Sequence, residues 1–152
     1  MKKLITSAVI IGFSQCTLAG APLPEDIVSK TISLLKNDKP VEAFEAALES
    51  NEYIKQKKSD LDAAKYQFAG FVKQIGAPTE CEELVSRNLI NRYRIDQYLC
   101  LSEMQPFVIQ FDFYRPDSDW RVQAFSFHSD ADDYIEESIK FEIGKKSLPE
   151  EN

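Results

Sequence analysis

PFVIQFDFYRPDSDWRVQAFSF, residues 106–127, has the pattern of two antiparallel strands joined by a polar loop. Apolar residues occupy every second position of the first strand: Phe107, Ile109, Phe111 and Phe113. Successive strand side chains point to opposite faces of a sheet, so these residues are expected to share one face. The other face carries a more polar set of residues: Val108, Gln110, Asp112 and Tyr114. The apolar face needs a cover, and the preceding chain is expected to supply it.

The loop of this hairpin contains a proline and two aspartates, which are typical turn residues. If Phe113 lies opposite Trp120, the next pair brings Asp112 against Arg121, a carboxylate beside a guanidinium. The alternation changes phase after Ala124. This change predicts a bulge there, or a strand end that is covered on both faces.

The N-terminal sequence MKKLITSAVIIGFSQCTLAG has the features of a secretory signal peptide over residues 1–19. Lys2 and Lys3 form a basic start, residues 4–13 an apolar run, and residues 17–19 a small-residue cleavage site. The apolar run is shorter than the ~20 residues that cross a membrane, so no stable membrane anchor is expected. A short lysine-led signal resembles bacterial Sec signals, which predicts the periplasm, or secretion, as the location.

The chain of 152 residues is acidic, with a formal net charge of −7. Loss of Lys2 and Lys3 with the signal peptide would make the charge of the mature chain −9. This charge argues against nucleic acid and anionic membrane surfaces as partners, since both reward a basic face. A basic protein partner would fit it better, although negative charge also serves simply to keep a secreted domain in solution.

Two cysteines, Cys81 and Cys100, remain after signal cleavage. If the first hairpin turns at Ile90 and Asn91, both cysteines are equidistant from the turn and lie opposite each other. That geometry predicts a disulfide, which an oxidising compartment would preserve. The alternative roles are metal ligand and nucleophile. His128 is the only histidine, and a zinc site needs three or four ligands, so no metal or other cofactor is expected.

Helical periodicity precedes the strands. A first helix is predicted from Pro24, a second short helix after Pro40, and a long third helix over residues 52–75. A break near Ser59 is the alternative for the third helix. Gly76 suits the residue that ends it.

From Cys81 the period changes to two. Residues 81–90 are predicted to form an edge strand and residues 91–104 a second strand. One face of the second strand would carry Tyr93, Ile95, Leu99 and Leu101, and the other Arg92, Arg94, Asp96 and Tyr98. A short final helix is predicted after Ser129 or Asp130. One domain over residues 22–143 and a solvated tail over residues 144–152 complete the interpretation.

Three helices followed by four antiparallel strands give an α+β order. Packing and turn features recur with this order: Val41-Glu42-Ala43-Phe44, Gly76, Glu83-Leu84-Val85, Pro106-Phe107, and Phe113-Tyr114-Arg115-Pro116 leading to Trp120 and Phe125. On these residues the chain resembles the NTF2-like (cystatin-like) superfamily, and within it small exported bacterial proteins. The resemblance implies N-terminal helices packed on the concave side of a curved four-stranded antiparallel sheet, with a short C-terminal helix.

No catalytic motif accompanies this resemblance. The first functional hypothesis is therefore a secreted or periplasmic binding or interaction module without catalytic machinery. The alternative is a small-ligand binder, or an isomerase- or dehydratase-like enzyme, that uses the concave cavity of the sheet. The sequence does not determine the oligomeric state.

Some NTF2-like enzymes place a carboxylate base and a tyrosine or acid donor in the concavity. The candidates in this chain would be Asp96, Asp112, Tyr93, Tyr98, Tyr114 and His128. Asp96 and Asp112 are both expected on the polar face, away from the helices, which favours a solvated surface over an active site. A shallow binding surface is a further hypothesis, with these residues: Arg92, Arg94, Tyr98, Gln110 and Tyr114.

Overall fold

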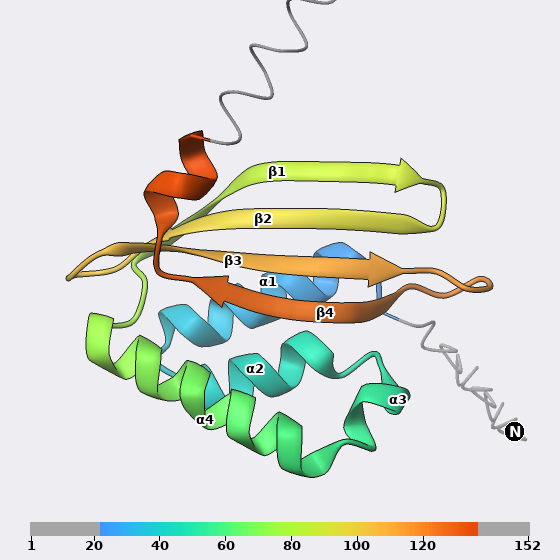
Figure 1. Ribbon diagram of the computed structural model, residues 1–152, viewed down its shortest axis with the longest axis horizontal. Coiled ribbons are helices and arrows are strands. Elements are labelled where there is room, and N and C mark those ends of the chain that lie inside the picture. The colour runs from blue at the N-terminus through green and yellow to red at the C-terminus, as the bar shows by residue number, and fades with distance from the viewer. Residues whose placement is uncertain (1–21, 137–152) are drawn as a thin grey trace, which may run out of the picture.

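The computed structural model describes residues 22–136. The predicted signal peptide and the predicted tail from Gly144 lie outside these residues. Four helices, α1 (Pro24–Lys36), α2 (Pro40–Leu48), α3 (Glu52–Lys55) and α4 (Lys58–Ile75), precede four strands. The strands are β1 (Glu80–Ile90), β2 (Tyr93–Leu101), β3 (Pro106–Tyr114) and β4 (Arg121–His128). Figure 1 shows the helices gathered on one side of the sheet, so the predicted α+β class is confirmed.

The helices α1, α2 and α3 begin at residues whose local chemistry favours the start of a helix. Pro24 and Pro40 occupy the first turns of α1 and α2, where a missing backbone N–H costs nothing. The predicted long third helix is split into α3 and α4, which is the alternative with a break near Ser59. Asn51 caps α3, and its Oδ1 accepts hydrogen bonds from the N–H groups of Tyr53 and Ile54. Gly76 ends α4 with a φ of 92°, a conformation that favours glycine.

The four strands form one antiparallel sheet in the order β1-β2-β3-β4. The predicted register of the β3–β4 hairpin is wrong, because Phe113 lies opposite Val122 and Trp120 belongs to the loop. The guanidinium of Arg115 lies 4.9 Å from the ring centre of Trp120, and this contact helps to hold the wider loop. The predicted irregularity is confirmed, since the register shifts at Gln123, next to Ala124.

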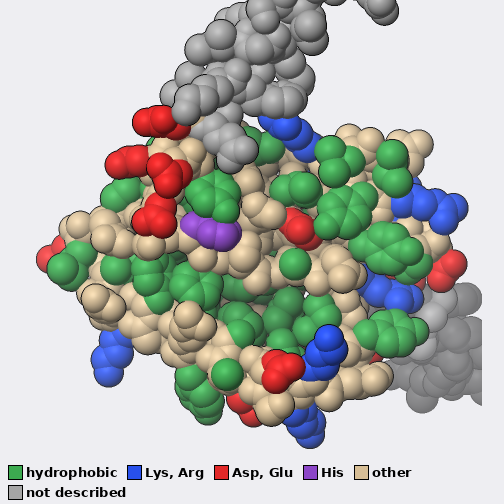
Figure 2. Space-filling view, viewed as in Figure 1, with side chains coloured by type: hydrophobic (Ala, Val, Ile, Leu, Met, Phe, Trp, Pro, Cys, Tyr) green, Lys and Arg blue, Asp and Glu red, His purple; other side chains and the backbone are tan. Residues whose placement is uncertain are grey.

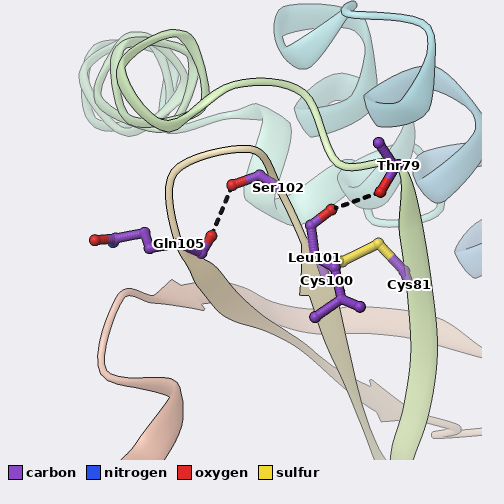
Figure 3. Close-up of a disulfide and its surroundings, with 6 residues drawn as sticks. All are labelled: Thr79, Cys81, Cys100, Leu101, Ser102 and Gln105. Carbon is purple, nitrogen blue, oxygen red and sulfur yellow. Dashed lines mark hydrogen bonds between the residues drawn. A yellow bond between two sulfur atoms is a disulfide. The ribbon is translucent and has the colours of Figure 1, made fainter.

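The β1–β2 hairpin turns at Asn91 and Arg92, one residue later than predicted. A uniform ladder from that turn would not bring Cys81 opposite Cys100. Two register shifts in β1, at Leu84 and Leu89, compensate for the difference. The two Cα atoms then lie 4.0 Å apart, and the predicted disulfide is confirmed (Figure 3).

The centre of the molecule is a layer of aromatic rings between helices and sheet. Phe107, Phe111 and Phe113 are completely buried, so the prediction that helices cover this face is confirmed. Phe68 of α4 packs against Phe125 of β4, with ring centres 5.3 Å apart. Burial of such rings excludes water and holds the two layers together.

The sheet does not curl around the helices, which differs from the curved sheet that the resemblance implied. Its register shifts lie in the outer strands β1 and β4, while β2 and β3 pair without interruption. Bulges are the usual cause of sheet bending, so the central pair has no such bend.

Residues 131–136 are helical, as predicted for the chain after Ser129. The ring of Tyr134 in this segment lies 4.5 Å from the ring of His128, on the face of the sheet opposite the four helices. None of the helices within residues 22–136 has the length and apolar character needed to cross a membrane.

Candidate functional site

Asp96 lies on the face of the sheet that the helices cover, and the prediction that put it on the opposite face is wrong. The β2–β3 register pairs Asp96 with Phe111 and Tyr98 with Ile109. Residues directly opposite each other in an antiparallel pair share a face, so Asp96 belongs with the buried rings. Its exposed fraction is 0%.

A polar network surrounds this buried carboxylate. Asp96 Oδ1 accepts hydrogen bonds from Ser86 Oγ and from Arg94 Nε, each at 2.8 Å. Arg94 Nη1 also donates to Glu25 of α1, and this bond lowers the pKa of the Glu25 carboxyl. Asp96 Oδ2 has no hydrogen-bond partner within residues 22–136. The network therefore connects β1, β2 and α1 and leaves one buried acceptor unused.

A groove of about 710 Å³ runs between α1 and the β1–β2 half of the sheet. Val28, Ser29 and Ile32 form part of its helix wall, and the sheet wall contains Glu83, Arg94 and Tyr98. Tyr98 donates a hydrogen bond from its hydroxyl to Glu83 at 3.3 Å. Burial raises the pKa of Tyr98, and the nearby charges of Asp96 and Glu83 raise it further.

Asp112 lies on the other face of the sheet and has partners there. Its carboxylate accepts hydrogen bonds from Tyr93 (3.1 Å) and Gln110 (2.7 Å), and Gln97 donates to Gln110 at 2.7 Å. The predicted pairing of Asp112 with Arg121 is wrong, because Asp112 lies opposite Ala124. Figure 2 views this face, which carries scattered hydrophobic side chains, with acidic side chains over the helical segment 131–136. The hydrogen bonds around Asp112 therefore indicate a polar ladder with a structural role.

The remaining candidates do not join Asp96. His128 Nε2 lies 3.1 Å from Ser126 Oγ, and Tyr114 is exposed beyond the end of the polar ladder. Tyr93, Tyr114 and His128 all belong to the outer face, opposite the buried carboxylate.

The five residues of the predicted binding surface do not form one surface. Arg94 and Tyr98 line the groove beside α1, whereas Gln110 and Tyr114 lie on the outer face of the sheet. Arg92 occupies the hairpin turn and donates a hydrogen bond to the carbonyl of Pro116. Only the Arg94–Tyr98 pair therefore contributes to a concave site.

Sequence reasoning missed the α1 wall of the groove. Glu25, Val28, Ser29 and Ile32 recur at helical spacing on one side of α1. The helical periodicity from Pro24 predicts the helix, but it does not show that one side of this helix forms a groove with β1 and β2. A second hollow of about 580 Å³ lies among α1, α2 and α4, and ion pairs such as Lys30–Glu49 and Lys65–Glu45 neutralise its rim.

Within residues 22–136, no group of three or more His, Cys, Asp or Glu side chains is placed to hold a metal ion. Comparisons of the chain with family models, with curated proteins and with solved structures found no match. The functional argument therefore starts from the groove beside α1.

Proposed function

We propose that this protein is a non-enzymatic binding module of the periplasm or the extracellular space, and that its partner occupies the groove beside α1. The supporting observation is the groove itself. Its volume of about 710 Å³ falls within the range of ligand sites, ~300–1,000 Å³. Its walls combine apolar Val28 and Ile32 with positioned polar groups, as binding sites do. The Cys81–Cys100 disulfide fits an oxidising compartment.

Binding is favoured over catalysis because the buried carboxylate cannot be reached. A general base has to come within hydrogen-bond reach of the substrate proton. Asp96 has no exposed surface, and its Oδ1 is already engaged by Ser86 and Arg94. An isomerase- or dehydratase-like reaction at Asp96 would require α1 to move away from the sheet.

The charge of the chain supports a basic partner. Glu83 is exposed on the groove side of β1, Glu80 and Glu82 are exposed on its outer face, and the chain has a net charge of −7. Opposite charges raise association rates and make binding sensitive to salt. Binding of the natural partner should therefore weaken as ionic strength rises.

A pull-down from periplasmic extract tests this proposal with two matched variants. Ser29→Tyr would fill the groove, whereas Ser59→Tyr adds the same ring at an exposed position of α4 outside it. We expect one basic protein to be retained at low salt by the wild type and by Ser59→Tyr, and to be lost with Ser29→Tyr. Equal retention by all three proteins, or no retained protein, would contradict the proposal.

A small-ligand binder or enzyme is the second candidate. The unused hydrogen-bond acceptor Oδ2 of Asp96 favours it, on the condition that α1 moves away from the sheet when the ligand enters. NMR titration with a fragment library, observing the carboxyl carbon of Asp96, distinguishes the two. Fragments that shift this signal in the wild type but not in Ser29→Tyr would support the small-ligand function. An Asp96 signal that no fragment moves would exclude it.

Membership of the NTF2-like superfamily is also a proposal. Its support is the order of helices before strands, with the helices on one face of the sheet. The uncurled sheet counts against it. A crystal structure with a sheet that wraps around α4 would support membership, and a flat sheet would contradict it.

A further inference from the structure

We propose that the partner binds as an extended peptide segment that adds a strand to the free edge of β1, with its alternate side chains in the groove beside α1. This inference rests on the proposed function and specifies the mode of binding. Strand addition uses backbone hydrogen bonds for affinity and pockets for alternate side chains for specificity. The sheet edge and the groove supply these two parts.

The two edges of the sheet differ. At the β4 edge, Ser50 and Asn51 occupy both backbone groups of Val122: its N–H donates to Ser50 Oγ at 2.9 Å, and its C=O accepts from Asn51 Nδ2 at 2.7 Å. This cover prevents another strand from pairing there. At the other edge, β1 is hydrogen-bonded to β2 alone among the strands of residues 22–136.

The β1 edge is held rigid near the acidic end. The disulfide joins Cys81 to Cys100, and the N–H and Oγ of Thr79 both donate to the carbonyl of Leu101, at 2.9 and 3.2 Å. Figure 3 shows the bridge and this contact side by side at the start of β1. A fixed edge has little conformational entropy of its own to lose when a peptide binds.

The length of α1 limits how much of an extended chain can lie beside it. α1 has 13 residues and is about 20 Å long, which corresponds to roughly six residues of an extended peptide. Long side chains on the helix-facing side of such a peptide would extend past Glu83 of β1 toward Ile32 of α1, since both residues line the groove. The chemistry of these walls selects apolar residues at alternate positions.

The charges beside the edge define the rest of the peptide. Glu80 and Glu82 are exposed on the outer face of β1, and Glu83 is exposed on the groove side. Lysine or arginine between the apolar positions would complement these carboxylates. The expected partner is therefore a basic segment in which apolar and basic residues alternate.

Selection from a display library of random peptides, followed by synthesis of the best binder, tests the mode of binding. Each backbone N–H of the peptide is methylated in turn. In an added strand every second N–H points to β1, so methylation at alternate positions should weaken affinity by roughly tenfold, and at the others hardly at all. Methylation that has equal effects at every position would overturn strand addition.

Variants of the protein test the acidic β1 edge and the helix wall of the groove separately. Glu82→Gln should lower the affinity of the selected peptide by roughly two- to tenfold at low salt and less at high salt, whereas Asp119→Asn in the exposed β3–β4 loop should leave it unchanged. Ser29→Tyr should abolish binding and Ser59→Tyr should not. Peptides that bind Ser29→Tyr as well as the wild type would overturn both this inference and the proposed function. Loss with Ser29→Tyr but no alternation in the methyl scan would overturn this inference alone.

The same experiments would also reveal either of two other occupants of the β1 edge. A second copy of the chain paired through β1 would make the protein a dimer by light scattering, and the peptide would dissociate it. The chain's own residues 137–152 would block the peptide until they are removed by truncation. Either result would overturn a separate partner peptide, and a monomer that binds the peptide with its full chain supports it.

Discussion

Arg94 joins three parts of the molecule that are distant in sequence. It donates to the buried Asp96 on its own strand and to Glu25 of α1. Asp96 in turn accepts from Ser86 of β1. A buried carboxylate is costly unless it is paired and hydrogen-bonded, so these contacts fix the position of α1 beside the groove.

Replacement of Arg94 should therefore destabilise the fold strongly. Arg94→Met leaves the Asp96 carboxylate buried without its cation and should cost about 3–5 kcal/mol in urea unfolding. The double variant Arg94→Met with Asp96→Leu should recover much of this loss, because the unpaired charge is then absent. Arg121→Met, whose guanidinium lies over the ring of Tyr53, serves as the control and should cost about 1 kcal/mol or less. Equal costs for the two arginines would contradict a buried ion pair.

Tyr98 should make stability fall at alkaline pH. Burial, with the charges of Asp96 and Glu83, raises its pKa in the folded protein. The folded state then holds this proton more tightly than the unfolded chain, so the free energy of unfolding should decrease as pH rises above about 10. Unfolding midpoints measured across this range should decline less in Tyr98→Phe. Tyr66→Phe, on the exposed side of α4, should decline as the wild type does.

At the scale of elements, β1 shows how irregular pairing serves a covalent link. The hairpin turn at Asn91 and Arg92 and the disulfide at Cys81 and Cys100 are compatible only because β1 contains two register shifts. The same shifts interrupt the regular outer edge of β1. Such interruptions limit indiscriminate edge-to-edge pairing, and the regular ladder is confined to the stretches between them, such as Val85–Asn88.

Removal of the disulfide should lower stability without changing the fold. The bridge spans 19 residues, and its loss should cost about 3 kcal/mol in the loop-entropy model. Urea unfolding of Cys81→Ala/Cys100→Ala against the wild type measures this cost. Intact mass after thiol alkylation without reductant should show that neither of these cysteines reacts, and alkylation of both would refute the bridge.

At the scale of the whole molecule, aromatic contacts hold the helical layer on the sheet. Phe68 of α4 packs against Phe44 of α2 and against Phe125 and Phe127 of β4, with ring centres 5.0–6.0 Å apart. A single side chain thus connects both helices with the sheet. Unfolding of the two layers should therefore be one cooperative transition.

Truncation of this ring tests that cooperativity. Phe68→Ala should cost about 3–5 kcal/mol, since it leaves a cavity at the junction of the layers. Tyr66→Ala, at a side chain that is 66% exposed on the same helix, should cost much less. Transitions followed by circular dichroism and by the fluorescence of Trp120 should coincide in the wild type. Helical signal lost before the Trp120 signal would show that the layers unfold separately.

Local chemistry was enough to predict the α+β class, the starts of α1 and α2, the end of α4 at Gly76 and the buried face of β3. Each of these depends on residues near one another in the chain: a proline at a first turn, a glycine at a positive φ, or apolar residues at every second position. The disulfide also followed from spacing, although β1 needs two irregularities to form it.

The face of β2 was decided only by tertiary structure. Its apolar residues suggested that Ile95 would be buried and Asp96 exposed, and the structure has Asp96 buried. The connection after β2 pairs Asp96 with Phe111, and the strongly apolar face of β3 then determines which side of β2 lies under the helices. Burial of the apolar face of β3 that contains Phe111 is worth more free energy than burial of the weaker apolar face of β2. Arg94 and Ser86 then supply the hydrogen bonds that the buried Asp96 needs. The groove beside α1 follows from this pairing between distant strands, which the pattern of a single strand does not contain.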